Sequence, residues 1–117
     1  MKLDLNQFLP LSPAVLHILL ALSGEDRHGY AIMQEIARQS GGRYKLGPGT
    51  LYDNLEKLLE KGFVRELPRQ RGEEDPRRRY YRLSDTGKKL LTTEIERLES
   101  MIREARGHLR PHPRRAT

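Results

Sequence analysis

The chain has 117 residues, 36% hydrophobic and 32% charged, which is enough for one compact domain with a very polar surface but not for two. It contains no cysteine, which excludes disulfides, cysteine-ligated zinc and a thiol nucleophile. The formal net charge of +6 favours an anionic partner.

Neither a membrane span nor a secretory signal is recognisable in the sequence. The longest apolar run, Ala14 to Leu22, is interrupted by His17 and is shorter than the roughly 20 residues that a membrane helix needs. The first residues, Met1 to Asp4, lack the basic and apolar regions of a signal peptide. We therefore expect a cytoplasmic protein.

The positive charge is concentrated in two patches. From Arg65 to Arg82 seven arginines face four acidic residues, and from Arg103 onward five arginines face one. Clustered arginine suits a polyanion, because each phosphate that is neutralised releases condensed counterions. A solubilising surface is the alternative interpretation of the same charge.

Helical periodicity predicts three helices in the first half of the chain. Ser12-Pro13 is a helix start, and the residues that follow to Ser23 are apolar nearly all round, which predicts a buried core helix. A shorter amphipathic helix over 28–39 has one stripe of Tyr30, Met33, Ile36 and Ala37. A third helix, from Gly47 to Gly62, turns inward Leu51, Leu55, Leu58 and Leu59. Its opposite face is a polar stripe of Thr50, Asp53, Asn54, Lys57 and Lys61.

The pattern then changes from helical to extended. Two short β-compatible segments, 63–67 and 78–83, flank a polar loop and predict a hairpin. Ser84 or Asp85 can cap a final helix whose apolar residues are spaced four and three apart, at Leu91, Ile95, Leu98, Ile102, Ala105 and Leu109. So narrow a seam favours a partner helix from a second copy of the chain.

Three helices followed by a hairpin are the arrangement of a winged helix-turn-helix, in which the third helix enters the major groove of DNA and the hairpin contacts flanking phosphates. The fold class we expect is mainly α with a small β-hairpin, extended by a long dimerisation helix. We divide the chain into a dimer-supporting apolar segment (1–11), the DNA-binding domain (12–83), the dimerisation helix (84–110) and a disordered basic tail (111–117).

Several segments, in order and at natural spacings, resemble the PadR-like family of transcriptional regulators. These are Leu11-Ser12-Pro13, His28-Gly29-Tyr30-Ala31-Ile32, Gly47-Pro48-Gly49-Thr50-Leu51-Tyr52, Leu58 to Val64, and Arg79 to Gly87. The resemblance implies a dimeric repressor that responds to a small-molecule effector, of the compact branch with a single C-terminal helix. Two departures are Gly47, where such proteins often have Ser, and the absence of any Trp on the dimer helix to trap flat drugs.

Candidate DNA contacts follow from side-chain chemistry. Thr50, at the start of the third helix, can donate to a phosphate, and Tyr52 can do so through its hydroxyl. Asn54 is the best base reader, because its amide can pair with adenine, and Lys57 and Lys61 suit phosphates. Asp53 would repel phosphates unless it accepts from a cytosine amino group. The complete predicted set is Tyr30, Lys45, Gly49, Thr50, Tyr52, Asn54, Lys57, Lys61, Arg77, Arg78 and Arg79.

Other functions find less support in the sequence. Glu94, Glu96 and Glu99 lie on one continuous helix with no cleft-forming sequence nearby, so we do not expect an enzyme or a cofactor. His108 and His112 have the spacing of half a zinc site, but no second pair of ligands accompanies them, so no metal site is predicted. A winged helix whose basic hairpin docks an acidic protein is the alternative to binding double-stranded DNA.

Overall fold

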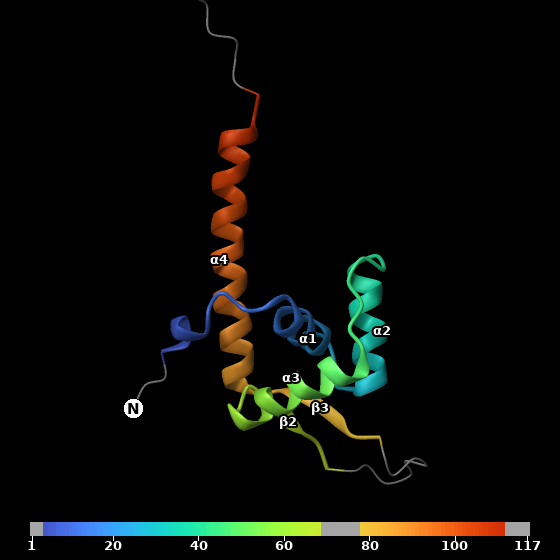
Figure 1. Cartoon of the computed structure of the whole chain (residues 1–117). Coiled ribbons are helices and arrows are strands. Elements are labelled where there is room, and N and C mark those ends of the chain that lie inside the picture. Colours follow the sequence, from blue (N-terminus) through green and yellow to red (C-terminus); the bar gives the residue numbers. More distant parts are fainter. Residues whose placement is uncertain (1–3, 69–77, 112–117) are drawn as a thin grey trace, which may run out of the picture.

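The computed structural model of the chain describes residues 4–68 and 78–111. A short 3-10 helix, η1 (Leu5–Phe8), is followed by α1 (Pro13–Ser23), β1 (Arg27–His28), α2 (Gly29–Gln39) and α3 (Pro48–Glu60). The chain continues through β2 (Val64–Glu66) and β3 (Tyr80–Leu83) into the long helix α4 (Asp85–Leu109). Figure 1 shows the three shorter helices beside one half of α4, while the other half extends away from them. The predicted mainly α winged helix-turn-helix with a long final helix is confirmed.

Side chains that accept from free backbone N–H groups fix where three of the helices begin. Ser12 Oγ accepts from Val15 N at 3.2 Å before α1, and Ser84 Oγ accepts from Gly87 N at 2.9 Å before α4. The sequence predicted either Ser84 or Asp85 as the cap of α4, and in the structure Ser84 is the cap. His28, predicted to lie inside the second helix, is instead its cap, with Nδ1 accepting from Ala31 N at 3.1 Å.

The sheet differs from the predicted hairpin, because it has a third strand. Its order is β1-β3-β2 and both pairings are antiparallel. Arg27 lies opposite Tyr81 in one pairing, and Val64 lies opposite Leu83 in the other. Two residues, Arg27 and His28, are too short a segment to show a strand period in the sequence, so only the tertiary contact with β3 reveals them.

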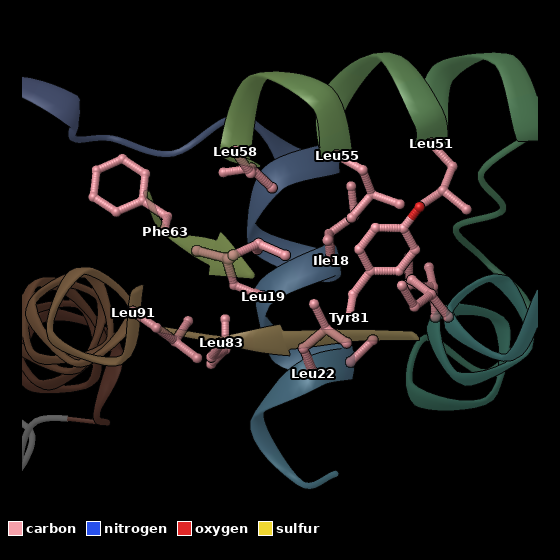
Figure 2. Close-up of a cluster of buried hydrophobic side chains, with 14 of the residues drawn as sticks. Ile18, Leu19, Leu22, Leu51, Leu55, Leu58, Phe63, Tyr81, Leu83 and Leu91 are labelled. Carbon is pink, nitrogen blue, oxygen red and sulfur yellow. The ribbon is translucent and has the colours of Figure 1, made fainter. Parts of the chain in front are cut away.

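The core forms around α1. Ile18 and Leu19 have no exposed surface, and α1 contacts α2, α3, β3 and α4. Figure 2 shows leucines of α3 pointing toward α1 from one side, while Tyr81 and Leu83 approach it from β3. In α2 the buried apolar side chains are Ile32 and Ile36, and the Glu35 side chain is buried beside them, whereas Tyr30, predicted on the same stripe as Ile36, is 62% exposed. The predicted stripe is therefore correct at Ile36 and at Met33, which packs against the core, and wrong at Tyr30.

The start of α4 is joined closely to the end of α3. Ser84 N donates to the carbonyl oxygen of Phe63 at 3.1 Å, and Ser84 Oγ donates to the carbonyl oxygen of Gly62 at 2.5 Å. Gly87 lies so near this turn that a Cβ there would overlap the carbonyl oxygen of Phe63. The first turn of α4 is therefore placed by backbone contact rather than by loose side-chain packing.

Only the first part of α4 belongs to the core of its own subunit. Leu91 is 6% exposed and Ile95 packs against the core, whereas Ile102 is 51% exposed. The predicted seam is therefore buried at its start and exposed at its end, which its regular spacing did not reveal. Leu98 is half-buried, and Ile102, Ala105 and Leu109 are exposed; the dimer contact predicted for them stays a prediction.

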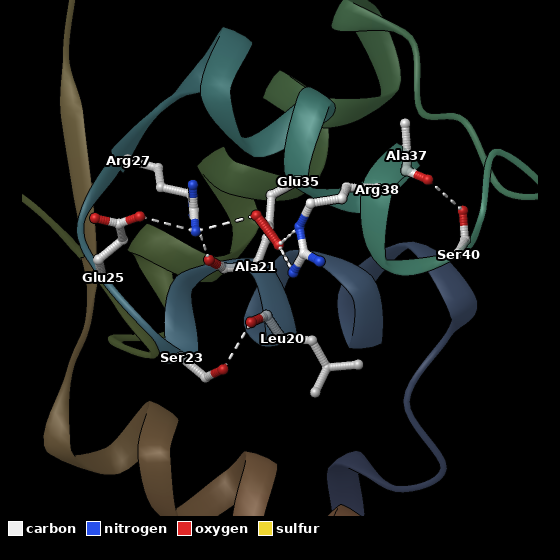
Figure 3. Close-up of polar contacts among 9 residues, drawn as sticks. All are labelled: Leu20, Ala21, Ser23, Glu25, Arg27, Glu35, Ala37, Arg38 and Ser40. Atoms are coloured by element: carbon white, nitrogen blue, oxygen red, sulfur yellow. Dashed lines mark hydrogen bonds and ion pairs between the residues drawn. The ribbon is translucent and has the colours of Figure 1, made fainter.

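Polar contacts fasten the turn between α1 and α2. Figure 3 shows the Arg27 guanidinium between Glu25 and Glu35, with Arg27 Nε also donating to the carbonyl oxygen of Ala21 at 2.8 Å. Arg38 pairs with Glu35 from one turn along α2. Next to this group, Arg82 of β3 makes two hydrogen bonds to Asp26, at 3.0 and 2.8 Å.

The segment before α1 packs against its own subunit. The rings of Phe8 and Phe63 meet edge to face with centroids 5.1 Å apart, and Leu5 and Leu9 also contact the core. Leu11 N donates to Glu94 Oε2 at 2.8 Å, and Arg97 Nε donates to the other oxygen of that carboxylate. Leu3 lies outside the described residues. The predicted support of the dimer by this segment stays a prediction.

Glu94 generates a stability prediction. The hydrogen bond from Arg97 holds its pKa below the ordinary value of 4.5, aided by the Leu11 N–H and opposed by burial. Between the lowered and the ordinary pKa the unfolded chain binds more protons, so this stability is complete above about 4.5 and is lost as the pH falls through that interval.

Glu94→Gln should therefore flatten the fall in unfolding free energy below about pH 4.5. Glu94→Ala should cost about 1–3 kcal/mol at neutral pH, because the Leu11 N–H loses its acceptor. Urea denaturation across acidic pH measures both effects. Glu96→Gln, which changes an exposed carboxylate on the same helix, is the matched control. Equal pH profiles for the two glutamine variants would contradict the role given to Glu94.

Candidate nucleic-acid interface

Helix α3 presents its polar side chains as predicted, with its leucines turned to the core. Leu51, Leu55 and Leu58 are buried, and Thr50, Tyr52, Asp53, Lys57 and Lys61 are exposed. Gly47 caps the helix without a side-chain hydrogen bond, and Pro48 occupies the first turn. Gly49 is exposed, and a Cβ at this position would meet no atom within 4 Å. The first turn of α3 is thus narrow, open and free to approach a ligand closely.

Asn54 is less available than the sequence suggested. It is half-buried, and its Nδ2 donates to the carbonyl oxygen of Thr50 at 2.8 Å, one turn earlier in the helix. Asn54 also lines a pocket between α3 and the segment before α1. An adenine contact would therefore need a different rotamer of this side chain, and its role as base reader stays a prediction.

The outermost line of α3 is acidic, which the sequence-based interpretation missed. Glu56 and Glu60 are exposed like Asp53, and these three residues recur at the three- and four-residue spacing of one helix face. The two lysines lie on the flank beside this face. If α3 lay lengthwise in a DNA groove, these three carboxylates would repel the phosphates. The parts of α3 suited to nucleic acid are therefore its first turn and the flank that carries Lys57 and Lys61. The spacing of Glu56 and Glu60 relative to Asp53 is a signal in the sequence that could have revealed this acidic face.

Tyr30 of α2 and Tyr52 of α3 both have large exposed surfaces. A Cβ on Gly29 would overlap the Tyr52 hydroxyl group, so the missing side chain of Gly29 makes room for the Tyr52 ring. The sequence placed Gly29 in a motif without giving it this function. Two exposed phenol groups are thereby held near the N-terminus of α2.

The loop between α2 and α3 carries Lys45, which is exposed. Its neighbour Tyr44 stacks on His17 of α1, with ring centroids 4.4 Å apart and planes 13° from parallel. Tyr44 N donates to Ser40 Oγ at 3.0 Å, which closes the loop. His17 was interpreted as a tolerated or partner-facing residue; it stacks within its own chain, while its buried Nδ1 has no hydrogen-bond partner among the described residues.

The arginines near the wing are not all equally available. Arg78 and Arg79 are exposed, but Arg79 Nε lies 3.5 Å from a carboxylate oxygen of Glu66 across the β2–β3 pair. Arg82, counted in the same basic patch, is engaged with Asp26. Arg77 lies outside the described residues. Among the arginines of this patch that the structure describes, Arg65 and Arg78 have no ion pair.

Neither a metal centre nor a membrane span is present in the described part of the chain. Residues 4–68 and 78–111 contain no group of three His, Asp or Glu side chains placed to hold a metal ion. Across the same ranges, no helix is both long and apolar enough to traverse a lipid bilayer.

An exposed third helix, a small antiparallel sheet beside it and a long terminal helix define a winged helix-turn-helix protein. Residues 15–93 match the model of the transcriptional regulator PadR-like family. Since that match covers more than half of the chain, the protein belongs to this family. It is therefore a transcriptional regulator with a DNA-binding fold and not an enzyme.

Curated and solved relatives agree with this assignment. Transcriptional regulator Rv3488 of Mycobacterium tuberculosis is 35% identical over 92 residues, which cover 79% of this chain and 81% of the relative. A transcriptional regulator from Clostridium thermocellum superposes with a TM-score of 0.66 at 27% identity, over 82% of this chain and 92% of its own. A PadR family regulator from Clostridium difficile gives 0.61 at 28% identity, over 83% and 97%.

The structure of Bacillus subtilis PadR in complex with operator DNA also resembles this chain. The TM-score is 0.63, and the similarity covers 92% of this chain and 53% of that one. At 22% identity this comparison shows a shared fold.

The contact between Gly29 and Tyr52 yields a second prediction. Gly29→Ala should destabilise the fold by no more than about 1 kcal/mol, because the new methyl group overlaps the Tyr52 hydroxyl end and this half-exposed ring must turn aside. In a Tyr52→Ala background the same change should cost little. Thermal unfolding of the four proteins measures this coupling. Gly24→Ala, whose Cβ would meet no atom within 4 Å, is the control, and an equal cost in both Tyr52 backgrounds would refute the assigned contact.

Proposed function

We propose that the protein is a sequence-specific repressor that binds double-stranded operator DNA as a homodimer and is released by a small-molecule effector. The observation that carries the proposal is the exposed surface of α3, with Thr50 in its first turn and Lys57 and Lys61 at its C-terminal end. Binding to chromosomal DNA agrees with the cytoplasmic location expected from the sequence.

The arrangement of the basic groups supports a DNA partner. In Figure 1, α3 and the β2–β3 pair lie at one end of the molecule, far from the free end of α4. Thr50 and Tyr52 can donate to phosphates from the first turn of α3, while Arg78 can reach a neighbouring phosphate from the sheet. The related B. subtilis PadR, of the same fold, was solved with operator DNA.

Charge on α3 suggests how the helix would approach DNA. With Asp53, Glu56 and Glu60 along its outer line, the favourable approach directs the N-terminal turn into the major groove and the lysine flank toward one phosphate strand. In that pose Asp53 can accept a hydrogen bond from a cytosine amino group. Base readout is then concentrated near Gly49, Thr50 and Asp53.

The exposed half of α4 supports a homodimer. Met101, Ile102 and Leu109 are 55%, 51% and 81% exposed in the single subunit. Burying one such side chain stabilises by roughly 1.5–3 kcal/mol, so several paired across a two-fold axis can hold a dimer. A dimer would also place two α3 helices about one DNA turn apart.

Lys57→Ala tests the DNA proposal. If Lys57 contacts a phosphate, the variant should weaken binding to all DNA sequences alike, and the slope of log affinity against log salt should fall by about 0.9 for each phosphate that is no longer neutralised. Fluorescence anisotropy with promoter DNA in a salt series measures the slope. Arg106→Ala removes the same charge from the free end of α4 and controls for net charge. No DNA binding by the parent protein at low salt would instead favour an acidic protein partner.

Ile102→Asp tests the dimer. Because Ile102 is half exposed in its own subunit, the change should leave the fold and its circular dichroism intact while placing two carboxylates near the dimer axis. Light scattering should then report a monomer, and operator affinity should fall sharply. Ser100→Asp, on the opposite side of the helix, should remain dimeric. A dimer as stable as the parent would rule out this face of α4.

A further inference from the structure

A pocket of about 110 Å³ lies between α3, α1 and the segment that precedes α1. It opens to solvent beside the lysine flank of α3. The residues that line it are Phe8, Leu11, Ser12, Val15, Asn54, Lys57, Leu58, Lys61, Phe63 and Leu90. Four separate parts of the fold therefore meet around one small space.

The floor of this pocket is apolar. Leu58, Phe63 and Leu90 are core residues that turn part of their surface toward it. The Phe8 ring forms one wall and is held edge to face against Phe63. A cavity of about 150 Å³ lined by such side chains accommodates a single benzene ring, so this pocket suits an apolar group of about four or five carbons.

The rim is polar, and its formal charge is positive. Lys61 Nζ lies 5.6 Å above the centre of the Phe8 ring, at the edge of the pocket, and Lys57 lies one turn earlier on the same flank. Ser12 accepts from Val15 N and keeps its own hydroxyl proton to donate. None of the described residues that line the pocket is a carboxylate. An apolar floor below two ammonium groups is complementary to a small apolar anion.

We propose that this pocket binds a short apolar carboxylate, with the chain on the floor and the carboxylate between Lys57 and Lys61, and that its occupation withdraws both lysines from DNA. The second part rests on the proposed function, whereas the first does not. A lysine paired with a bound carboxylate cannot neutralise a phosphate at the same time. Ligand and DNA therefore compete for the same charges, and each lowers affinity for the other by the same factor.

The hydrogen bond between Leu11 and Glu94 gives the pocket a fixed wall. Leu11 N donates a hydrogen bond to Glu94 Oε2 at 2.8 Å, which holds the segment from Phe8 to Leu11 against α4 when no ligand is bound. The apolar surface is thus formed before a ligand arrives, which lowers the cost of ordering it on binding.

Pentanoate is the probe for the first part of the proposal, used with the full chain and no DNA. In methyl NMR spectra it should cause saturable shifts of Val15, Leu58 and Leu90, with a dissociation constant roughly in the millimolar range expected for so small a ligand. Pentan-1-ol has the same chain without the charge, and acetate has the charge without the chain. Both should bind at least about threefold more weakly, because each lacks one of the two groups that the pocket recognises.

Two variants distinguish this pocket from unspecific binding. Lys57→Met with Lys61→Met should abolish the preference for pentanoate over pentan-1-ol while leaving pentan-1-ol binding intact. Val15→Phe should fill the pocket and remove the binding of both, with circular dichroism to confirm that it folds. Equal affinity for pentanoate, pentan-1-ol and acetate in the parent, no saturable shift at all, or shifts confined to the part of α4 beyond Leu91 would each overturn the proposal without any variant.

DNA-binding measurements with pentanoate test the second part of the proposal and distinguish its failure from a failure of the proposed repressor function. Pentanoate, at constant ionic strength, should weaken binding to promoter DNA and reduce the salt slope by about one to two, the number of lysines withdrawn. Acetate should do neither. Pentanoate binding without any DNA binding by the parent would refute the repressor but leave the pocket assigned. DNA binding that pentanoate leaves unchanged, although it occupies the pocket, would refute the coupling.

Discussion

The rest of the fold depends on the need to bury α1 on more than one side. A helix whose residues are apolar nearly all round needs cover on more than one side, and α2, α3, β3 and α4 all pack against it, burying Ile18, Leu19, Ala21 and Leu22. This arrangement explains why a chain of only 117 residues orders so many short elements. It also fixes α3 from behind: its leucines meet α1, and its polar side chains are consequently turned outward.

The connection between α3 and α4 makes the functional parts of the molecule one mechanical unit. Ser84 and Gly87 contact the backbone of Gly62 and Phe63. The end of α3, the helix that carries the exposed charges, is therefore packed against the start of α4, the helix that carries the exposed apolar face. Glu94 adds the segment before α1 to the same unit through Leu11. The start of α4 is thereby held against the end of α3 by contacts that leave little room for adjustment.

Acidic and basic side chains alternate over short distances on the surface, which the net charge of +6 does not show. In the basic patch around the sheet, Arg82 forms an ion pair with Asp26, and Arg79 forms an ion pair with Glu66. Helix α3 combines an acidic outer line with a basic flank. The proposed orientation on DNA, and the proposed competition with a small carboxylate, both follow from this division rather than from the total of +6.

The sequence by itself determined the order of the helices α1 to α4 and of the two strands between α3 and α4, the cap at Ser12, the leucine face of α3 and the family, because each depends on local spacing and on residue types that act within one turn of helix. Only the tertiary structure decided that Arg27 and His28 form a strand, that Gly29 makes room for Tyr52, and that Leu91 belongs to its own core while Ile102 does not. Each of these outcomes depends on what lies opposite a residue from a distant part of the chain. A regular seam of apolar residues looks the same whether the partner that covers it comes from its own subunit or from another.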